Sequence, residues 1–101
     1  MARFEIWFSE GVKADLQKFR AYDRRMILGT IKTQLTHAPH VETKQRKLLR
    51  NLTPPFEAIP PIWQLRAGEF RVFYDVQEAE GRVSVRAVRR KPAHRNTGEI
   101  L

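Results

Sequence analysis

The first 40 residues change from a strand-like to a helix-like spacing of their apolar positions. In "RFEIWF" (3–8) every second residue is Phe or Ile, which predicts a half-buried strand. Ser9 follows as a candidate helix N-cap, with acidic Glu10 in the first turn. Apolar residues then recur at helical spacing in two stripes: Val12, Leu16 and Phe19, and then Ile27, Leu28, Ile31 and Leu35. We expect two helices joined near residues 21–23, because a folded-back pair buries both stripes, and we expect Pro39 to end the second helix.

Residues 41–61 show neither periodicity. The stretch "ETKQRKLLRNL" (42–52) is basic and has only leucines as apolar anchors. The next stretch, "TPPFEAIPP" (53–61), contains four prolines, which exclude a helix and a central strand because proline lacks the backbone N–H that both need. We therefore expect a loop that Phe56 and Ile59 pin to the rest of the domain.

The residues from there to position 90 alternate again and predict three strands. They cover about 62–67, 70–76 and 82–90, with "EAEG" (78–81) as the second turn. The element order is β-α-α-β-β-β, which lacks the strand–helix alternation of a doubly wound parallel sheet. We expect a single α+β domain over residues 1–101, with an antiparallel sheet and the N-terminal helix pair packed on one face.

The register of the central hairpin follows from its turn. If Gly68-Glu69 is a two-residue loop with glycine at the positive φ of a type II′ turn, Arg66 faces Arg71 across the hairpin. The apolar residues then collect on the face that belongs against the helices: Trp63, Leu65, Val72, Tyr74 and Val76. The opposite, uncovered face receives Gln64, Arg66, Arg71, Phe73 and Asp75.

Two arginines that face each other suggest a function. Like charges opposite each other destabilise a sheet by up to roughly 1 kcal/mol, so folding alone does not require this pair. The pair is either splayed into solvent, with Asp75 compensating in part, or it forms an anion site. Arg86 and Arg90 or Lys91 of the last strand support the second interpretation if they border the same surface. Phe73 then offers an exposed ring on which an unpaired base can stack.

The charge balance favours a polyanionic partner. Nineteen Lys and Arg against eleven Asp and Glu give a formal net charge of +8 on 101 residues. Solubility alone, or an acidic protein partner, explains the same excess. If the partner is RNA, four basic residues of the loop are expected to contact its backbone: Lys44, Arg46, Lys47 and Arg50.

The composition also argues against several functional classes. The chain has no cysteine, which excludes a disulfide and a thiolate zinc site. His37 and His40 are three residues apart, but a metal site needs further oriented ligands, and we expect no metal and no cofactor. No apolar run has the length of a membrane span, and the N-terminus does not resemble a signal peptide, so we expect a cytoplasmic protein.

The hairpin carries a resemblance to a known superfamily. The segment "LRAGEFRVFYDV" (65–76), with the order of the elements, the basic Lys/Arg-Leu stretch and the closing "VSVRAVRRK" (83–91), resembles the RelE/ParE toxins of type II toxin–antitoxin modules. The resemblance implies an α+β domain with a concave basic face. RelE-like members are ribosome-dependent endoribonucleases that cut messenger RNA, and ParE-like members inhibit DNA gyrase. In both groups an antitoxin protein neutralises the toxin.

The resemblance implies roles for particular residues. Arg71 matches the hairpin arginine that contacts the scissile phosphate in RelE-like enzymes. Arg90 and Lys91 match the region of a second catalytic arginine. Ile62 and Gln64 stand where many members carry lysines, so that this chain has no charge at these two positions.

RNA cleavage without a metal needs three chemical contributions. The neighbouring 2′-hydroxyl attacks phosphorus, so a base must take its proton, an acid must protonate the leaving oxygen, and positive charge must stabilise the transition state. Many RelE-like members use a C-terminal tyrosine, which this chain lacks after Tyr74, and His94 in the tail is our candidate acid or base. The candidate cations are Arg66, Arg71, Arg90 and Lys91.

The sequence thus supports one favoured hypothesis and two alternatives. We favour a RelE-like messenger RNA interferase that acts at the ribosome and is inhibited by a cognate antitoxin. The first alternative is a ParE-like gyrase inhibitor, to which the missing lysines and tyrosine point. The second is a toxin-fold protein that binds RNA or its partner without catalysis.

Overall fold

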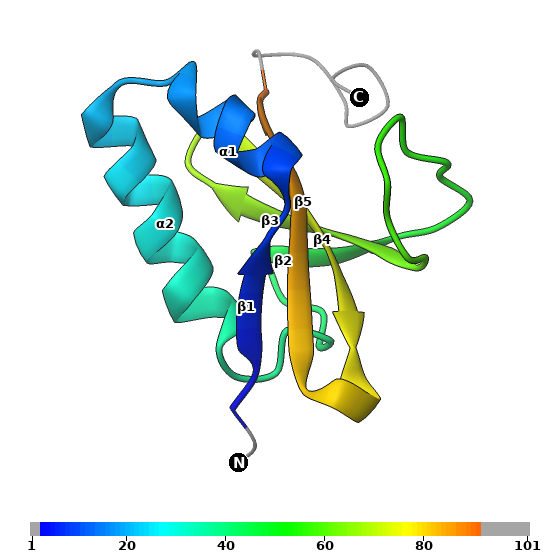
Figure 1. Ribbon diagram of the computed structural model, residues 1–101. Helices are drawn as coiled ribbons and strands as arrows, with labels where there is room; N and C mark the ends of the chain where they lie inside the picture. The colour runs from blue at the N-terminus through cyan, green and yellow to red at the C-terminus, as the bar shows by residue number, and fades with distance from the viewer. Residues whose placement is uncertain (1–2, 92–101) are drawn as a thin grey trace.

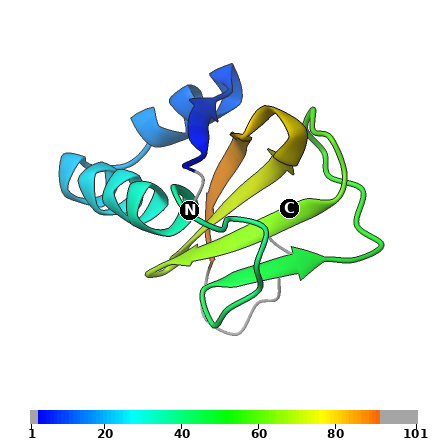
Figure 2. The ribbon, with the colours of Figure 1, turned by 90° about the horizontal axis from the view of Figure 1, so that it is seen from below.

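The computed structural model describes residues 3–91 and has two helices packed on one face of a five-stranded sheet (Figure 1). In chain order the elements are β1 (Glu5–Phe8), α1 (Glu10–Gln17), α2 (Ala21–Leu35), β2 (Arg46–Leu49), β3 (Ile62–Ala67), β4 (Phe70–Gln77), the 3-10 helix η1 (Glu78–Glu80) and β5 (Arg82–Arg90). Figure 2 shows the helices and the loop before β3 on opposite sides of the strands. The expected α+β architecture is confirmed.

The first strand lies beside the last one in the sheet. The strand order is β1-β5-β4-β3-β2, with β1 parallel to β5 and the other three pairs antiparallel. The expected antiparallel pairing is thus confirmed for β2 to β5, and β1 is the exception. The two helices form a long connection out of β1, and such a connection allows a strand to take a parallel neighbour.

The strand β2 was not predicted from the sequence. It lies within the segment expected to be a loop, and it pairs antiparallel with β3, with Lys47 opposite Gln64. The four prolines that argued against a strand stand at positions 54–61, beyond the end of β2. A four-residue edge strand needs a partner on one side only, so it forms without a strong alternating pattern.

The helices begin and end close to the predicted positions. The backbone N–H of Val12 donates to Oγ of Ser9 (3.3 Å), which confirms Ser9 as the N-cap of α1. The junction between the helices lies at residues 18–20, slightly before the predicted place. The second helix ends at Leu35, ahead of Pro39. Neither helix in residues 3–91 is long and apolar enough to cross a membrane.

The main core lies between the helices and the sheet. It contains the apolar stripes of both helices, except for exposed Leu28, and the hairpin residues that were predicted to face them. Val12, Ile27, Ile31, Leu35, Trp63, Leu65, Val72 and Tyr74 are buried there, and Val76 packs against them. Each fully buried side chain of this size contributes about 1.5–3 kcal/mol of transfer free energy. This burial fixes which face of the hairpin is turned away from the helices.

Residues 50–61, which we call the proline strap, cover part of the opposite face. A second apolar cluster lies beneath the strap: Ile62, Phe73 and Ala87 are buried, and Leu49, Phe56 and Ala58 pack against them. Phe56 pins the strap through its side chain, with its ring centroid 6.1 Å from that of Phe73. Ile59 pins it through the backbone, because its N–H donates to Oδ2 of Asp75 (2.9 Å).

Candidate nucleic-acid interface

The hairpin turn places two arginines opposite each other. Gly68 has a φ of 60° and, with Glu69, forms the two-residue turn that the sequence predicted. The β3–β4 register pairs Arg66 with Arg71, which confirms the predicted register. Because directly paired residues project to the same side of a sheet, both arginines belong to the face opposite the helices.

A third arginine continues this line onto the next strand. Arg71 pairs with Arg89 of β5, so Arg66, Arg71 and Arg89 form an arginine row across β3, β4 and β5. Neighbouring strands in such a sheet lie about 5 Å apart, so the three side chains start from adjacent positions. On the same face, Lys47 pairs with Gln64 in the next cross-strand line. The arginine row and exposed Lys47 form the candidate interface.

The three arginines differ in exposure and in their contacts. Arg66 is exposed, and within residues 3–91 its side chain makes no hydrogen bond or ion pair. Arg71 is only 6% exposed, and its Nη1 donates to the carbonyl oxygens of Gly68 (2.9 Å) and Phe70 (2.8 Å). Arg89 forms an ion pair with Asp15 of α1, with 2.7 Å between Nη1 and Oδ2.

The arginine row concentrates positive charge that residues 3–91 compensate only in part. Burial lowers the pKa of Arg71 from its ordinary value, and the positive charge of Arg66 lowers that pKa further. Asp15 supplies one negative charge against the three positive ones. A bound anion would counter both effects that disfavour the charged form of Arg71, so the row is suited to a phosphate.

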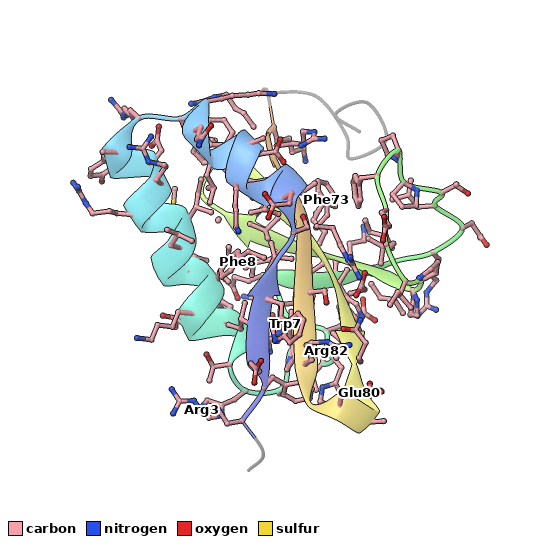
Figure 3. The ribbon with its side chains drawn as sticks, viewed as in Figure 1. Arg3, Trp7, Phe8, Phe73, Glu80 and Arg82 are labelled. Atoms are coloured by element: carbon pink, nitrogen blue, oxygen red, sulfur yellow. The ribbon has the colours of Figure 1, made fainter. Side chains whose placement is uncertain are left out.

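The expectation of an exposed Phe73 ring is wrong. Phe73 projects from the predicted face, but it is fully buried, because the proline strap and Phe56 cover it. Figure 3 marks Phe73 between the sheet and the strap. The ring therefore cannot stack on a base unless the strap moves, and Phe73 acts as a core residue of the second cluster.

Arg86 is also committed to structure. Its guanidinium forms a two-point ion pair with buried Asp75, with Nε–Oδ2 at 2.8 Å and Nη2–Oδ1 at 3.3 Å. A register shift in the β4–β5 pairing falls at Arg86, because Phe73 pairs with Ala87 whereas Tyr74 pairs with Val85. Asp75 therefore compensates Arg86, and within residues 3–91 no ion pair joins it to Arg66 or Arg71.

The same register shift moves Arg90 away from the arginine row. Arg90 pairs with Phe70 and lies over its ring, with Cζ 4.6 Å from the centroid. Its guanidinium contacts Glu69 and Asp23 of α2, so Arg90 belongs to the helix side and not to the candidate interface. The half-buried Lys91 is the last described residue, and its N–H donates to the carbonyl of Glu69 (2.7 Å). His94, the candidate acid or base, lies outside the described residues.

The basic residues of the 44–50 segment do not act as one group. Arg46 points toward the helix side, where Nη1 donates to the carbonyl of Gln34 (2.7 Å) and Nε to that of Val41 (3.0 Å). Lys44 and Lys47 are exposed. Arg50 is exposed and lies 3.9 Å from Glu42. Of the four predicted RNA contacts, the register brings Lys47 next to the arginine row.

Arg89 and its partner Asp15 were not among the candidate residues from the sequence. Strict alternation along 82–91 puts Arg90 on the uncovered face, and the register shift replaces it there by Arg89. One signal of this register shift was available in the sequence: strict alternation assigns the apolar Val88 to the polar face. Asp15 carried no such signal, because its contact joins residues 74 positions apart.

The described residues contain no cluster of three or more His, Cys, Asp or Glu side chains placed to hold a metal ion. What they bring together is positive charge on an open sheet face, which can bind and stabilise a phosphate. This arrangement by itself supplies no group that exchanges a proton near neutral pH.

Comparison with solved structures shows that the chain has a known fold. No protein-family model and no curated protein sequence matches the chain. A chain of the RelBE toxin–antitoxin complex of Mycobacterium tuberculosis is 18% identical with a TM-score of 0.72, over 90% of this chain and 94% of that one. A chain of the archaeal RelE–RelB complex of Pyrococcus horikoshii is 21% identical with a TM-score of 0.67, over 95% of this chain and 100% of that one.

A third solved structure is a double-arginine-to-alanine mutant of the E. coli toxin RelE in the free state. It is 25% identical with a TM-score of 0.57, over 90% of this chain and 84% of that one. The chain therefore has the RelE-like toxin fold, which confirms the resemblance seen in the sequence. All three structures are of RelE toxins or RelE–RelB complexes, which favours the RelE side of that resemblance over the ParE side.

Proposed function

We propose that this protein, which has the RelE-like fold, is the toxin of a type II toxin–antitoxin module and a ribosome-dependent endoribonuclease that acts on messenger RNA in the cytoplasm. The observation that carries the proposal is the arginine row on the sheet face opposite the helices. Adjacent like charges on three strands are unfavourable for folding, and a phosphate supplies the missing counter-charge.

The energies favour an anion site over a structural accident. The mutual repulsion of paired like charges costs up to roughly 1 kcal/mol per pair. A phosphate charge about 5 Å from a guanidinium gains about 3 kcal/mol at an effective dielectric constant of about 20. Exposed Arg66 can bind a phosphate oxygen directly, and the nearly buried Arg71 supplies a fixed positive charge beneath it.

The reaction that fits this site is an intramolecular transphosphorylation of the RNA chain. The 2′-oxygen forms a bond to phosphorus, the bond to the 5′-oxygen breaks, and the products are a 2′,3′-cyclic phosphate and a 5′-hydroxyl. The arginine row stabilises the added charge of the transition state. A base takes the 2′-proton and an acid protonates the 5′-oxygen, and we assign one of these roles to His94, with Lys91 as a further cation near the row.

The proposed protein partner is an antitoxin. Two of the similar structures are complexes of a RelE toxin with a RelB antitoxin. A net charge of +8 suits an acidic antitoxin as well as RNA. Inhibition then requires only that the antitoxin prevents access of RNA to the arginine row.

Expression of matched variants tests the proposal. We expect wild-type induction to stop growth and to produce translation-dependent cuts within codons, which Arg71→Ala abolishes and His94→Ala reduces. Lys32→Ala, which removes an exposed charge from α2 on the helix side of the sheet, serves as the control and should cut like the wild type. Intact transcripts with loss of DNA supercoiling would instead support gyrase inhibition, and no effect of the wild type would support an inactive binding protein.

A further inference from the structure

Asp15 links helix α1 to the end of strand β5. Its Oδ2 accepts a hydrogen bond from the backbone N–H of Val88 (2.9 Å) and from Nη1 of Arg89 (2.7 Å). The Asp15 side chain is 13% exposed, whereas that of Arg89 is 34% exposed. One end of the contact is thus fixed inside the protein, and the other end reaches the surface.

This contact restrains Arg89, the member of the arginine row on β5. A free arginine side chain has many rotamers, and it loses this conformational entropy when it binds a phosphate. Arg89 has already lost part of that freedom, because Nη1 is held by Asp15 and by the carbonyl of Val88 (3.1 Å). Both contacts use Nη1, so that, among the residues that the structure describes, Nε and Nη2 remain as donors that can face a phosphate beside Arg71.

We propose that Arg89 contacts the substrate phosphate and that Asp15 is its positioning residue. The inference deepens the proposed function, on which it rests, and adds two residues that the sequence did not indicate. Arg90, the neighbouring arginine, is held on the other face by Asp23 and Glu69, so the register of β5 selects Arg89 for this role.

Asp15 has two opposing effects on a bound RNA. They allow an experiment to distinguish a residue that positions Arg89 from one that only stabilises the fold. Its negative charge reduces the attraction of the row for phosphate, whereas its hydrogen bond orients Arg89. Asp15→Asn removes the charge. Its amide oxygen can still accept from the N–H of Val88, but the hydrogen bond to Arg89 is no longer an ion pair and holds the guanidinium less firmly. We therefore expect this variant to bind RNA as tightly as the wild type or more tightly, but to cleave it more slowly.

The test uses the full-length protein in two assays. On ribosomes carrying a defined messenger RNA, we expect the single-turnover cleavage rate of Asp15→Asn to fall about tenfold or more, as for a misplaced catalytic group. Arg89→Ala should slow cleavage at least as much, and the double variant should be no slower than Arg89→Ala alone. Asp23→Asn is the matched control, since it makes the same charge change in a similarly buried ion pair on the helix side and should cleave normally.

The second assay measures binding of a short single-stranded RNA over a range of salt concentrations. Arg89→Ala should reduce the slope of log K against log salt by about 1, because one phosphate contact is lost. The inference would be overturned if Arg89→Ala left the slope unchanged or if Asp15→Asn cleaved like the wild type. It would also be overturned if the cleavage rate, RNA affinity and melting temperature of Asp15→Asn all fell together. If the wild type does not cleave at all, the proposed function fails, and the binding assay still decides whether Arg89 contacts phosphate.

Discussion

Asp75 is predicted to be the residue that holds the proline strap on the sheet. Its carboxylate is fully buried and accepts hydrogen bonds from Arg86, from the side chain of Gln77 and from the backbone N–H of Ile59. The Arg86 side chain that pairs with it is only 15% exposed. Asp75→Ala therefore leaves a largely buried guanidinium without its counter-ion and leaves the Ile59 N–H without its acceptor.

The expected loss of stability is large for a domain of this size. Removing one partner of a buried ion pair costs about 3–5 kcal/mol, because the remaining charge is uncompensated. An unpaired buried N–H costs about 1–3 kcal/mol, and part of this overlaps with the first figure. A domain typically has only about 5–15 kcal/mol of stability, so Asp75→Ala should bring the protein close to unfolding. Asp75→Asn keeps an acceptor for Ile59 and should cost less.

Urea unfolding and hydrogen exchange measure the two consequences separately. The double variant Asp75→Ala with Arg86→Met should be more stable than Asp75→Ala alone, because it removes the orphaned charge. The Ile59 amide should exchange faster in both variants, whereas the Leu65 amide in the hairpin should follow global stability. The reasoning would be refuted if Asp75→Ala unfolded within about 1 kcal/mol of the wild type, or if exchange at Ile59 did not change.

Two further predictions concern the hairpin. Tyr74→Phe removes the hydrogen bond from the buried hydroxyl to the Pro39 carbonyl (2.7 Å) and should cost about 1 kcal/mol at pH 7. Burial raises the pKa of Tyr74, so the wild type loses stability as pH rises above the ordinary tyrosine pKa of about 10. The difference in free energy of unfolding between the two proteins, measured with urea, should therefore be smaller at pH 11 than at pH 7. A difference that does not change with pH would contradict this. Gly68→Ala and Gly81→Ala each put a Cβ at a φ near 60° and should each cost about 1–2 kcal/mol in urea unfolding. Only Gly68→Ala should also slow RNA cleavage, because its turn sets the Arg66–Arg71 pairing, and equal cleavage by both variants would count against the arginine row.

The sequence alone determined the hairpin and the helix pair. Strict alternation on both sides of Gly68-Glu69 allows one register, because a slip by one residue would turn Leu65 and Val72 away from the helices. The same pattern put Arg66 and Arg71 on the uncovered face, and Ser9 marked the start of the first helix. These features depend on residues close together in the chain, where spacing and turn chemistry are sufficient.

The tertiary structure decided which residues form the interface. The register shift in β5 exchanged Arg90 for Arg89, and the proline strap buried Phe73. The Asp75 carboxylate took Arg86 out of the candidate set. Each of these outcomes depends on a contact between segments that are distant in sequence, and the energy of such a contact is set by burial and charge pairing in three dimensions. No local pattern of residues contains that information, which is why the charge and the fold could be predicted but the membership of the arginine row could not.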